Sequence, residues 1–326
     1  MNKRERVLAA LDGRRVDHVP FTVWRHYYFQ DRSAEGLAQA TLDFYRRYGP
    51  DMIVCSPGPF YMAEGWKMNV RSFSNDSIPH YTVEPAIRQA TDWRWLSELD
   101  VQTSSLRREI EAIRLVKAQL TPEDATLIMP LFSPLITANI LRGGRIIEDM
   151  RSFSSDLRSG LETIAKATQD LSLACLEAGA DGFLFVNRLA DREKMCSREF
   201  RDFGQRFDLP VLALLADRSA IRILSTEGGR FFFDMANSYP VQAVCWETWR
   251  SDPSIEDAHR QLRCGLMGGL NPITFAAGSA RDVQGQVTEA VNQTGGWHML
   301  VSPSGPLPPN SQDELIGAVR QVLQEL

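Results

Sequence analysis

The chain has 326 residues, of which 44% are hydrophobic and 24% are charged, with a formal net charge of −5 at pH 7. Acidic and basic residues are mixed along its length, so we expect neither a nucleic-acid partner nor a membrane-surface anchor. The sequence has no apolar stretch of roughly 20 residues and no signal-peptide pattern, so we expect a cytoplasmic protein. The five scattered cysteines indicate neither a disulfide framework nor a zinc knuckle.

Hydrophobic periodicity predicts short apolar strands that alternate with amphipathic helices along nearly the whole chain. The first elements in chain order are a helix at 4–11, a strand at 21–24, a helix at 37–48, a strand at 51–55, a helix at 107–120, a strand at 126–132, a helix at 156–178 and a strand at 182–186. The later ones are a helix at 198–207, strands at 211–215 and 241–246 with a helix at 230–237 between them, a helix at 255–262, a strand at 265–270, a helix at 280–293, a strand at 298–302, and a last helix that a capping box at Ser311–Glu314 would open. Eight strands in this alternation are typical of the α/β class and of a (β/α)8 TIM barrel.

The alternation is lost between about residues 56 and 105. Two runs in this stretch, at 66–70 and 80–83, predict a hairpin. We therefore expect one TIM-barrel domain over residues 1–326, with a short N-terminal helix at its bottom and an insertion after the second strand. The insertion is expected to lie over the barrel mouth.

In a TIM barrel the chemistry resides on the loops that follow the strands. The predicted strands place three arginines there, and a guanidinium group can bind a carboxylate through two parallel hydrogen bonds. These arginines are Arg25, Arg188 and Arg218. An anionic substrate is the natural inference, although Arg25 and Arg188 could instead pair with Asp31, Asp191 or Glu64, and Arg218 with Asp217.

Two predicted mouth residues could transfer protons. His26 follows the first strand, and a histidine with an ordinary pKa of about 6.5 exchanges protons near neutral pH. Glu247 follows the sixth strand and could act as an acid or base if burial raised its pKa. A packed, hydrogen-bonded histidine and a solvated loop carboxylate are the structural alternatives. The other candidate substrate-binding residues are Tyr61, Glu64, Asp217 and Ser304.

Five segments occur together in a specific order and spacing. They are residues 4–11 leading to Asp17-His18-Val19-Pro20, then Trp24-Arg25-His26, Ser133-Pro134-Leu135, Gly268-Gly269-Leu270 and residues 303–310. Together they resemble the uroporphyrinogen decarboxylase superfamily, which also contains corrinoid and coenzyme M methyltransferases. The resemblance covers nearly the whole chain and implies a (β/α)8 barrel with a deep polar cleft that is often dimeric, so a homodimer is expected.

The chain departs from both known chemistries of that superfamily. The decarboxylases have an aspartate where Gly58 falls here, a tyrosine where Asn139 falls and a serine where Asn187 falls, so the resemblance makes Asn139 and Asn187 candidate catalytic residues. The methyltransferases hold zinc with a His-x-Cys after the fifth strand and a cysteine after the eighth. The corresponding predicted segments here are residues 212–217, without histidine or cysteine, and Ser304.

The sequence therefore predicts a divergent, metal-independent enzyme of the lyase or decarboxylase type. We expect it to act on a small carboxylated molecule without a cofactor, with His26 delivering a proton to a developing carbanion. One alternative is methyl or one-carbon transfer by a zinc-free route, with a corrinoid protein as partner. Another is a non-catalytic ligand-binding barrel.

Overall fold

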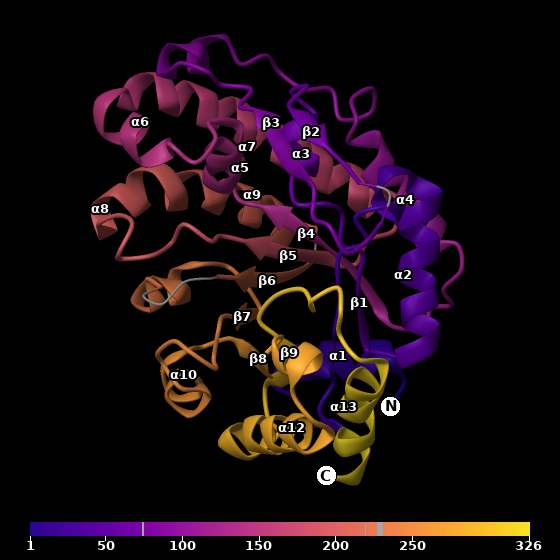
Figure 1. Cartoon of the computed structure of the whole chain (residues 1–326). Coiled ribbons are helices and arrows are strands. Elements are labelled where there is room, and N and C mark those ends of the chain that lie inside the picture. The colour runs from indigo at the N-terminus through magenta and orange to yellow at the C-terminus, as the bar shows by residue number, and fades with distance from the viewer. Residues whose placement is uncertain (74, 219, 227–230) are drawn as a thin grey trace.

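The structure is a computed structural model, and it describes residues 1–73, 75–218, 220–226 and 231–326. Seven parallel strands form one curved sheet, which is consistent with a TIM-like barrel (Figure 1). In sheet order the strands are β1 (Met52–Val54), β4 (Thr126–Phe132), β5 (Gly182–Val186), β6 (Ile221–Ser225), β7 (Ala243–Cys245), β8 (Gly265–Leu270) and β9 (Met299–Pro303). β4, β5, β8 and β9 are almost wholly buried, so their sequences read as continuous apolar runs.

The strand predicted at 21–24 is not a regular strand. Phe21 makes an isolated parallel bridge to Val301 of β9, and the N–H of Thr22 donates to the Val301 carbonyl at 3.0 Å. On the other side, the N–H of Asp51 donates to the Phe21 carbonyl at 2.9 Å. Residues 20–25 thus lie between the two edge strands, with sparse hydrogen bonding to each.

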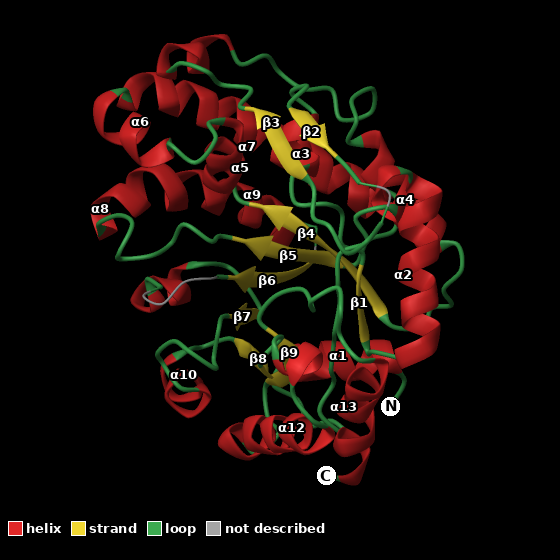
Figure 2. Cartoon of the chain, viewed as in Figure 1, coloured by secondary structure: helices red, strands yellow, loops and turns green. Residues whose placement is uncertain are grey.

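Helices lie outside the sheet (Figure 2). They are α1 (Lys3–Leu11), α2 (Ala34–Tyr48), α4 (Arg107–Lys117), α5 (Pro134–Leu141), α6 (Ile146–Ser152), α7 (Ser154–Glu177), α8 (Ser197–Phe200), α9 (Arg206–Asp217), α10 (Ile255–Gln261), α11 (Thr274–Ala277), α12 (Ala280–Thr294) and α13 (Asp313–Glu325). α1 begins with a capping box, in which the Asn2 side chain accepts from the Glu5 N–H and the Glu5 carboxylate accepts from the Asn2 N–H. No described helix combines the length and apolarity needed to cross a membrane.

Three further sequence predictions are wrong in detail. The apolar run at 211–215 is part of α9, which buries Phe207, Val211 and Leu215 at helical spacing, and the strand comes later as β6. The capping box predicted at Ser311 is absent, because the Ser311 hydroxyl donates to the Pro308 carbonyl and Gln312 precedes α13 without a side-chain cap. The helix predicted at 230–237 is a 3-10 helix over Phe233–Ser238, and residue 230 lies outside the described residues.

The predicted insertion contains the predicted hairpin. It includes α3 (Tyr61–Glu64), the antiparallel strands β2 (Asn69–Arg71) and β3 (Tyr81–Glu84), and a 3-10 helix over Ala90–Trp95. The 3-10 helix is attached to the outer helices, since Trp93 Nε1 donates to Asp149 of α6 at 2.8 Å and Arg94 pairs with Asp156 of α7. The hairpin end of the insertion carries His80, which is buried against the segment after residue 25.

Candidate active site

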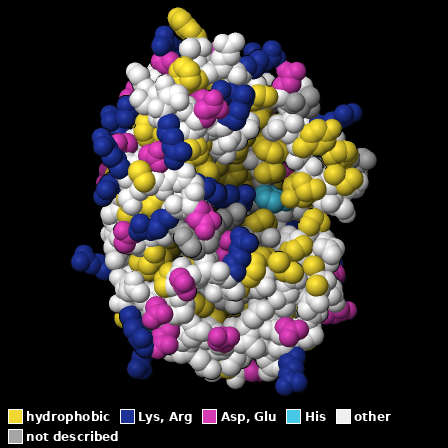
Figure 3. All heavy atoms as spheres, turned by 60° about the vertical axis from the view of Figure 1, so that its left-hand side comes forward, with side chains coloured by type: hydrophobic (Ala, Val, Ile, Leu, Met, Phe, Trp, Pro, Cys, Tyr) yellow, Lys and Arg dark blue, Asp and Glu magenta, His cyan; other side chains and the backbone are white. Residues whose placement is uncertain are grey.

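A narrow cavity lies where the carboxyl ends of the strands meet. Its volume is about 20 Å³. It is lined by the ends of β4, β5 and β6 and by the segments that follow residues 20–25, β1, β5 and β9: Trp24, His26, Ser56, Pro57, Pro59, Tyr61, Pro130, Phe132, Leu184, Val186, Arg188, Ser225, Ser304, Gly305 and Pro306. This side of the molecule is hollowed near its middle, where a histidine lies beside basic side chains and apolar ones surround them (Figure 3). Parallel strands bring these residues together because they all end at the same edge of the sheet.

His26 is a hydrogen-bonded, neutral histidine. Its Nδ1 lies 3.2 Å from Ser56 Oγ, and its ring lies 5.4 Å from the ring of Tyr28. Burial, and secondarily the positive charge of Arg188, lower the pKa of His26 to about 4. With this pKa, His26 is neutral near pH 7, unlike the ordinary histidine that was expected from the sequence.

Of the three predicted arginines, Arg188 lines the cavity and is half-buried. Arg25 does not line it, because its guanidinium lies over the rings of Tyr27 and Phe44, at 5.4 and 5.9 Å, on the α2 side. Successive residues of an extended chain point to opposite sides, so Trp24 and His26 face the cavity while Arg25 faces away.

Asp217 and Arg218 lie at the opposite end of the fold from the predicted position. Asp217 is the last residue of α9 and Arg218 follows it directly; both are exposed and lie before β6 rather than after a strand. Arg218 lines a surface hollow together with Arg4 and Asp181 at the amino ends of the strands. The prediction that these two residues follow a strand is thus wrong, and it failed because the apolar run before them was assigned to a strand.

Asn187 belongs to a fully buried polar cluster that the sequence did not reveal. Its Nδ2 donates to Asp208 Oδ2 at 2.7 Å, and the Tyr239 hydroxyl donates to the same oxygen at 2.8 Å. Burial raises the pKa of Asp208 to about 7, although both hydrogen bonds lower it. Asp208 lies 21 residues after Asn187, and Tyr239 lies 31 residues after Asp208, so no short sequence motif connects the three residues. Asn139, on α5, is half-buried and does not line the cavity.

Glu247 is buried and forms a close ion pair with Arg250, with nitrogen–oxygen distances of 2.6 to 2.9 Å. The Arg250 guanidinium lies over the Trp249 ring, and Trp249 Nε1 donates to Ser304 Oγ at 3.3 Å. This chain of contacts connects the turn after β7 to the cavity wall at Ser304. Glu247 is therefore buried and ion-paired, and it is not a solvated loop carboxylate.

The two candidates from the insertion lie in different surroundings. Tyr61 is fully buried, with its hydroxyl donating to the Pro130 carbonyl at 2.9 Å and its ring 5.1 Å from that of Phe132. Burial raises its pKa far above the ordinary value, so Tyr61 forms a cavity wall as a neutral phenol. Glu64 pairs with Arg108 of α4 at 3.0 Å and is not among the cavity-lining residues.

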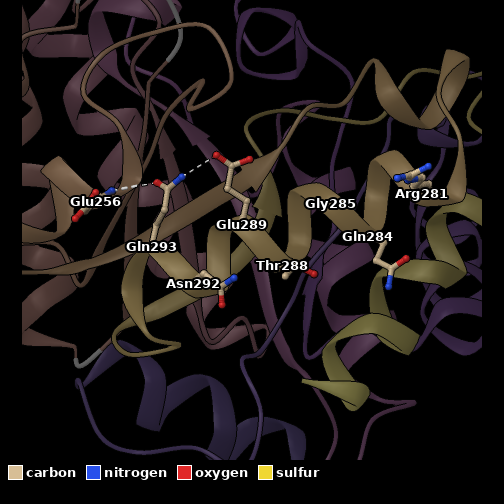
Figure 4. A pocket seen from close by; sticks show the side chains of 8 residues that line it. All are labelled: Glu256, Arg281, Gln284, Gly285, Thr288, Glu289, Asn292 and Gln293. Atoms are coloured by element: carbon tan, nitrogen blue, oxygen red, sulfur yellow. Dashed lines mark hydrogen bonds between the residues drawn. The ribbon is translucent and has the colours of Figure 1, made fainter.

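A second, wider hollow lies on the outer face of α12, with a volume of about 770 Å³ (Figure 4). Its side chains hydrogen-bond one another: Gln293 accepts from the Glu256 N–H at 3.2 Å and donates to Glu289 at 3.0 Å. It is lined by Glu256, Arg281, Gln284, Gly285, Thr288, Glu289, Asn292 and Gln293. All its lining residues come from two outer helices, so it lacks the strand-end position that barrel active sites share.

The residues at the strand ends do not fit the zinc site of the methyltransferase branch. β6 ends in Ser225 and is followed by Thr226, and β9 is followed by Ser304, so none of these positions supplies a thiolate or imidazole. Within the described ranges, no group of three or more His, Cys, Asp or Glu side chains is arranged to hold a metal ion. We therefore derive no step through zinc.

Comparison with known proteins places this geometry in a family. A family model described as uroporphyrinogen decarboxylase (URO-D) matches residues 2–326. Among solved structures, a methyltransferase from Methanosarcina mazei superposes with a TM-score of 0.86 and 17% identity, covering 100% of this chain and 99% of the other. A B12-independent methionine synthase from Shewanella sp. superposes with a TM-score of 0.59 and 12% identity, covering 94% of each chain.

A putative vitamin-B12-independent methionine synthase from Listeria monocytogenes gives a TM-score of 0.56 at 11% identity, covering 95% of this chain and 97% of the other. Identities this low show a shared fold. A search of curated proteins found no match. The match over nearly the whole chain shows that this protein belongs to the uroporphyrinogen decarboxylase family.

Proposed function

We propose that this protein is a lyase of the decarboxylase type that acts on a small carboxylated molecule at the strand-end cavity. The observation that supports the proposal is that Arg188 and His26 line the same cavity, whose other walls are mostly apolar. An apolar wall strengthens the attraction between a guanidinium and a carboxylate, because little water competes for either group.

The size of the cavity favours a small substrate. A volume of about 20 Å³ holds roughly one water molecule, so wall side chains must move aside even for a short carboxylic acid. Pro57, Pro59 and Pro306 stiffen three parts of the wall. A four-pyrrole macrocycle would require a far larger displacement, so we do not assign uroporphyrinogen as the substrate.

In this proposal, binding of the substrate raises the pKa of His26, so that His26 can act as the acid. A carboxylate bound by Arg188 offsets the positive charge that lowers the pKa of His26, and its own negative charge raises that pKa. When the carbon–carbon bond to a departing CO₂ breaks, the electron pair stays on the substrate carbon, delocalised over an adjoining carbonyl or ring. The His26 imidazolium then gives its proton to that carbon, a C–H bond forms, and the neutral imidazole regains a proton from solvent.

The test is to incubate the full chain in D₂O with carboxyl-labelled malonate and aromatic acids, and to follow labelled CO₂ and product deuteration by NMR. We expect one deuterium on the product carbon for each CO₂ released, and loss of both signals in Arg188→Gln. Arg218→Gln is the matched control, because Arg218 lies at the opposite end of the strands. Carboxylate binding without release of CO₂ would instead support the non-catalytic barrel.

Methyl transfer is the second candidate. It is supported by the close superposition on the M. mazei methyltransferase over the whole chain. Incubation with methylcobalamin or a methylated corrinoid protein would reveal it as demethylation of the cobalt centre in the visible spectrum. Elemental analysis of the untagged protein complements this assay, since near-stoichiometric zinc or cobalt would favour methyl transfer through ligands not identified above. The expected homodimer is tested by light scattering.

A further inference from the structure

A buried carboxylate and a buried imidazole lie together behind the cavity wall. Asp31 is 2% exposed and His80 is 7% exposed, and His80 Nε2 lies 3.4 Å from Asp31 Oδ1. His80 Nε2 also donates to the carbonyl oxygen of Tyr28. Neither carboxylate oxygen of Asp31 nor the Nδ1 of His80 has a hydrogen-bond partner. Buried polar atoms are rarely left in this way, and where they are, a functional reason is common.

Both side chains pack against Gly58. A β-carbon added to Gly58 would lie 2.7 Å from Asp31 Oδ2 and 3.2 Å from His80 Nδ1, so any larger residue would displace the pair. Pro57 and Pro59, on either side of Gly58, line the cavity. A single backbone segment, residues 57–59, therefore separates the pair from the cavity.

Residues 56–59, the segment that contains Gly58, also contact His26. Ser56 Oγ lies 3.2 Å from His26 Nδ1, and hydrogen bonding to Ser56 and Pro57 favours the charged form of His26. The Tyr28 ring forms a second connection, at 5.4 Å from the His26 ring and 5.6 Å from the His80 ring. Residues 56–59 are thus held between His26 on one side and the Asp31–His80 pair on the other.

The charges around the pair leave it poised to bind or release a proton near neutrality. Burial raises the pKa of Asp31 to about 7; Arg108 and Arg32 lower it, and Glu64 and Asp76 raise it. The pair is faced by groups on its own 3-10 helix, on the insertion, on α3 and on α4: Arg32, Asp76, Glu64, Arg108 and Glu109. His80 in its charged form lowers the pKa of His26, so the pair and His26 are electrostatically coupled.

We propose that Asp31 and His80 are a positioning pair whose protonation state sets the orientation and the protonation of His26 through the Ser56–Pro59 segment. The catalytic meaning of the pair rests on the proposed function, in which His26 is the acid. The coupling itself does not rest on that function. As pH rises through neutrality the pair loses one proton, its charge becomes more negative, and the charged form of His26 becomes more favourable. The insertion, which carries His80, thereby becomes part of the active site.

The test is a pH titration of the full chain, labelled with ¹⁵N-histidine, from pH 5 to 9 by NMR. We expect a step in the His80 ring-nitrogen shifts near pH 7 and a simultaneous step in the Nδ1 shift of His26. Both steps should disappear in Asp31→Asn, which keeps the shape of the side chain and removes the titrating group. The step at His26 should also disappear in His80→Gln, whose His26 pKa should be higher than that of the wild type.

Asp76→Asn is the matched control. It removes one negative charge near Asp31, but the Asp76 side chain accepts from the Phe29 N–H, which an asparagine oxygen can still do. This variant should keep both steps. The proposal is overturned if His26 shows no step in the wild type, or if the step survives in Asp31→Asn. Circular dichroism confirms that each variant is folded.

A separate result addresses the proposed function. If the NMR coupling is present but no carboxylate is turned over, the pair stands and the decarboxylase assignment fails. If turnover is found, the pH dependence of kcat for His80→Gln should shift relative to the wild type. A purely structural role of His80 would lower stability without moving that profile.

Discussion

The two ends of the sheet differ in how their buried charges are compensated. At the amino ends, Arg6 is paired with Asp17 at 2.7 Å and Asp51 at 2.6 Å, and Asp51 also accepts from the Phe21 N–H. Asp181 accepts from Arg4, Lys117 and the Leu127 N–H. Each of these carboxylates is held by at least two donors, so this end of the molecule fixes where the chain enters the sheet.

At the carboxyl ends the buried polar groups are less completely satisfied. Asp31 has no hydrogen-bond donor on either oxygen, and Asp208 and Asn187 each keep one buried oxygen without a partner. Burial raises the pKa of both aspartates to about 7. The comparison shows that buried charges are well compensated at the amino ends, whereas buried groups with unsatisfied hydrogen bonds lie at the carboxyl ends, where the candidate site is.

The largest effect should come from breaking the amino end. Arg6→Ala leaves Asp51 buried without its cation and should cost about 3–5 kcal/mol of unfolding free energy. Urea denaturation measures this. Arg14→Ala is the control, because Arg14 is exposed and should change stability by less than about 0.5 kcal/mol. A loss below about 1 kcal/mol for Arg6→Ala would refute the division between the two ends.

Arg188→Gln should affect ligand binding more than stability. It should weaken binding of the substrate carboxylate by about 100-fold, since a charged donor facing an apolar wall is removed, and it should cost less unfolding free energy than Arg6→Ala, because Arg188 is only half-buried. Calorimetric titration with the substrate measures the first and urea denaturation the second. Arg25→Gln should retain binding, because Arg25 lies over Tyr27 and Phe44 outside the cavity. Equal losses in both variants would contradict the assignment of Arg188.

His26→Ala should fold normally and lower kcat by at least about tenfold, in line with typical general-acid contributions. The kcat of Ser56→Ala provides a comparison for that of His26→Ala. Ser56 contacts His26 Nδ1 at 3.2 Å, so its loss should disturb the orientation of His26 and produce a smaller decrease in kcat. Unchanged turnover in His26→Ala would remove His26 from the mechanism.

The smallest expected effect is on the pH dependence of stability. The folded-state pKa of Asp31 is raised from 3.8 to about 7, so its contribution to stability is fully present below pH 3.8 and is lost as pH rises to about 7. Asp31→Asn removes this loss. The difference in Tm between Asp31→Asn and the wild type should therefore grow in favour of the variant by about 1–3 °C from pH 5 to pH 8. A Tm difference that is constant with pH would show that Asp31 titrates normally.

The sequence was sufficient for much of the fold. The runs over Thr126–Phe132, Gly182–Val186 and Gly265–Leu270 are strands with the predicted bounds, because a buried parallel strand is continuously apolar and ends at a polar or glycine residue. The run at 211–215 is equally apolar but is one face of α9. Short apolar runs do not distinguish a strand from a buried helix, and that ambiguity misplaced Asp217 and Arg218.

Most of the cavity residues that were predicted lie two residues after the end of a predicted strand, and Tyr61 of the insertion is the exception. His26, Arg188 and Ser304 meet this condition, and all three line the cavity. Asp31 and His80 are 49 residues apart, and the insertion brings them together through tertiary packing that leaves no spacing in the sequence. The pKa of His26 could not be foreseen either, because it depends on burial and on the nearby charge of Arg188.

The most direct test of the account is the proton balance of carboxylate binding. Calorimetric titration of malonate, succinate and benzoate, repeated in two buffers of different ionisation enthalpy at pH 6, gives the number of protons taken up. We predict uptake by the wild type, because the bound carboxylate raises the pKa of His26 from about 4, and no uptake by His26→Ala. Binding without proton uptake, or binding of equal strength in Arg188→Gln, would contradict the claim that Arg188 and His26 act together on a carboxylate.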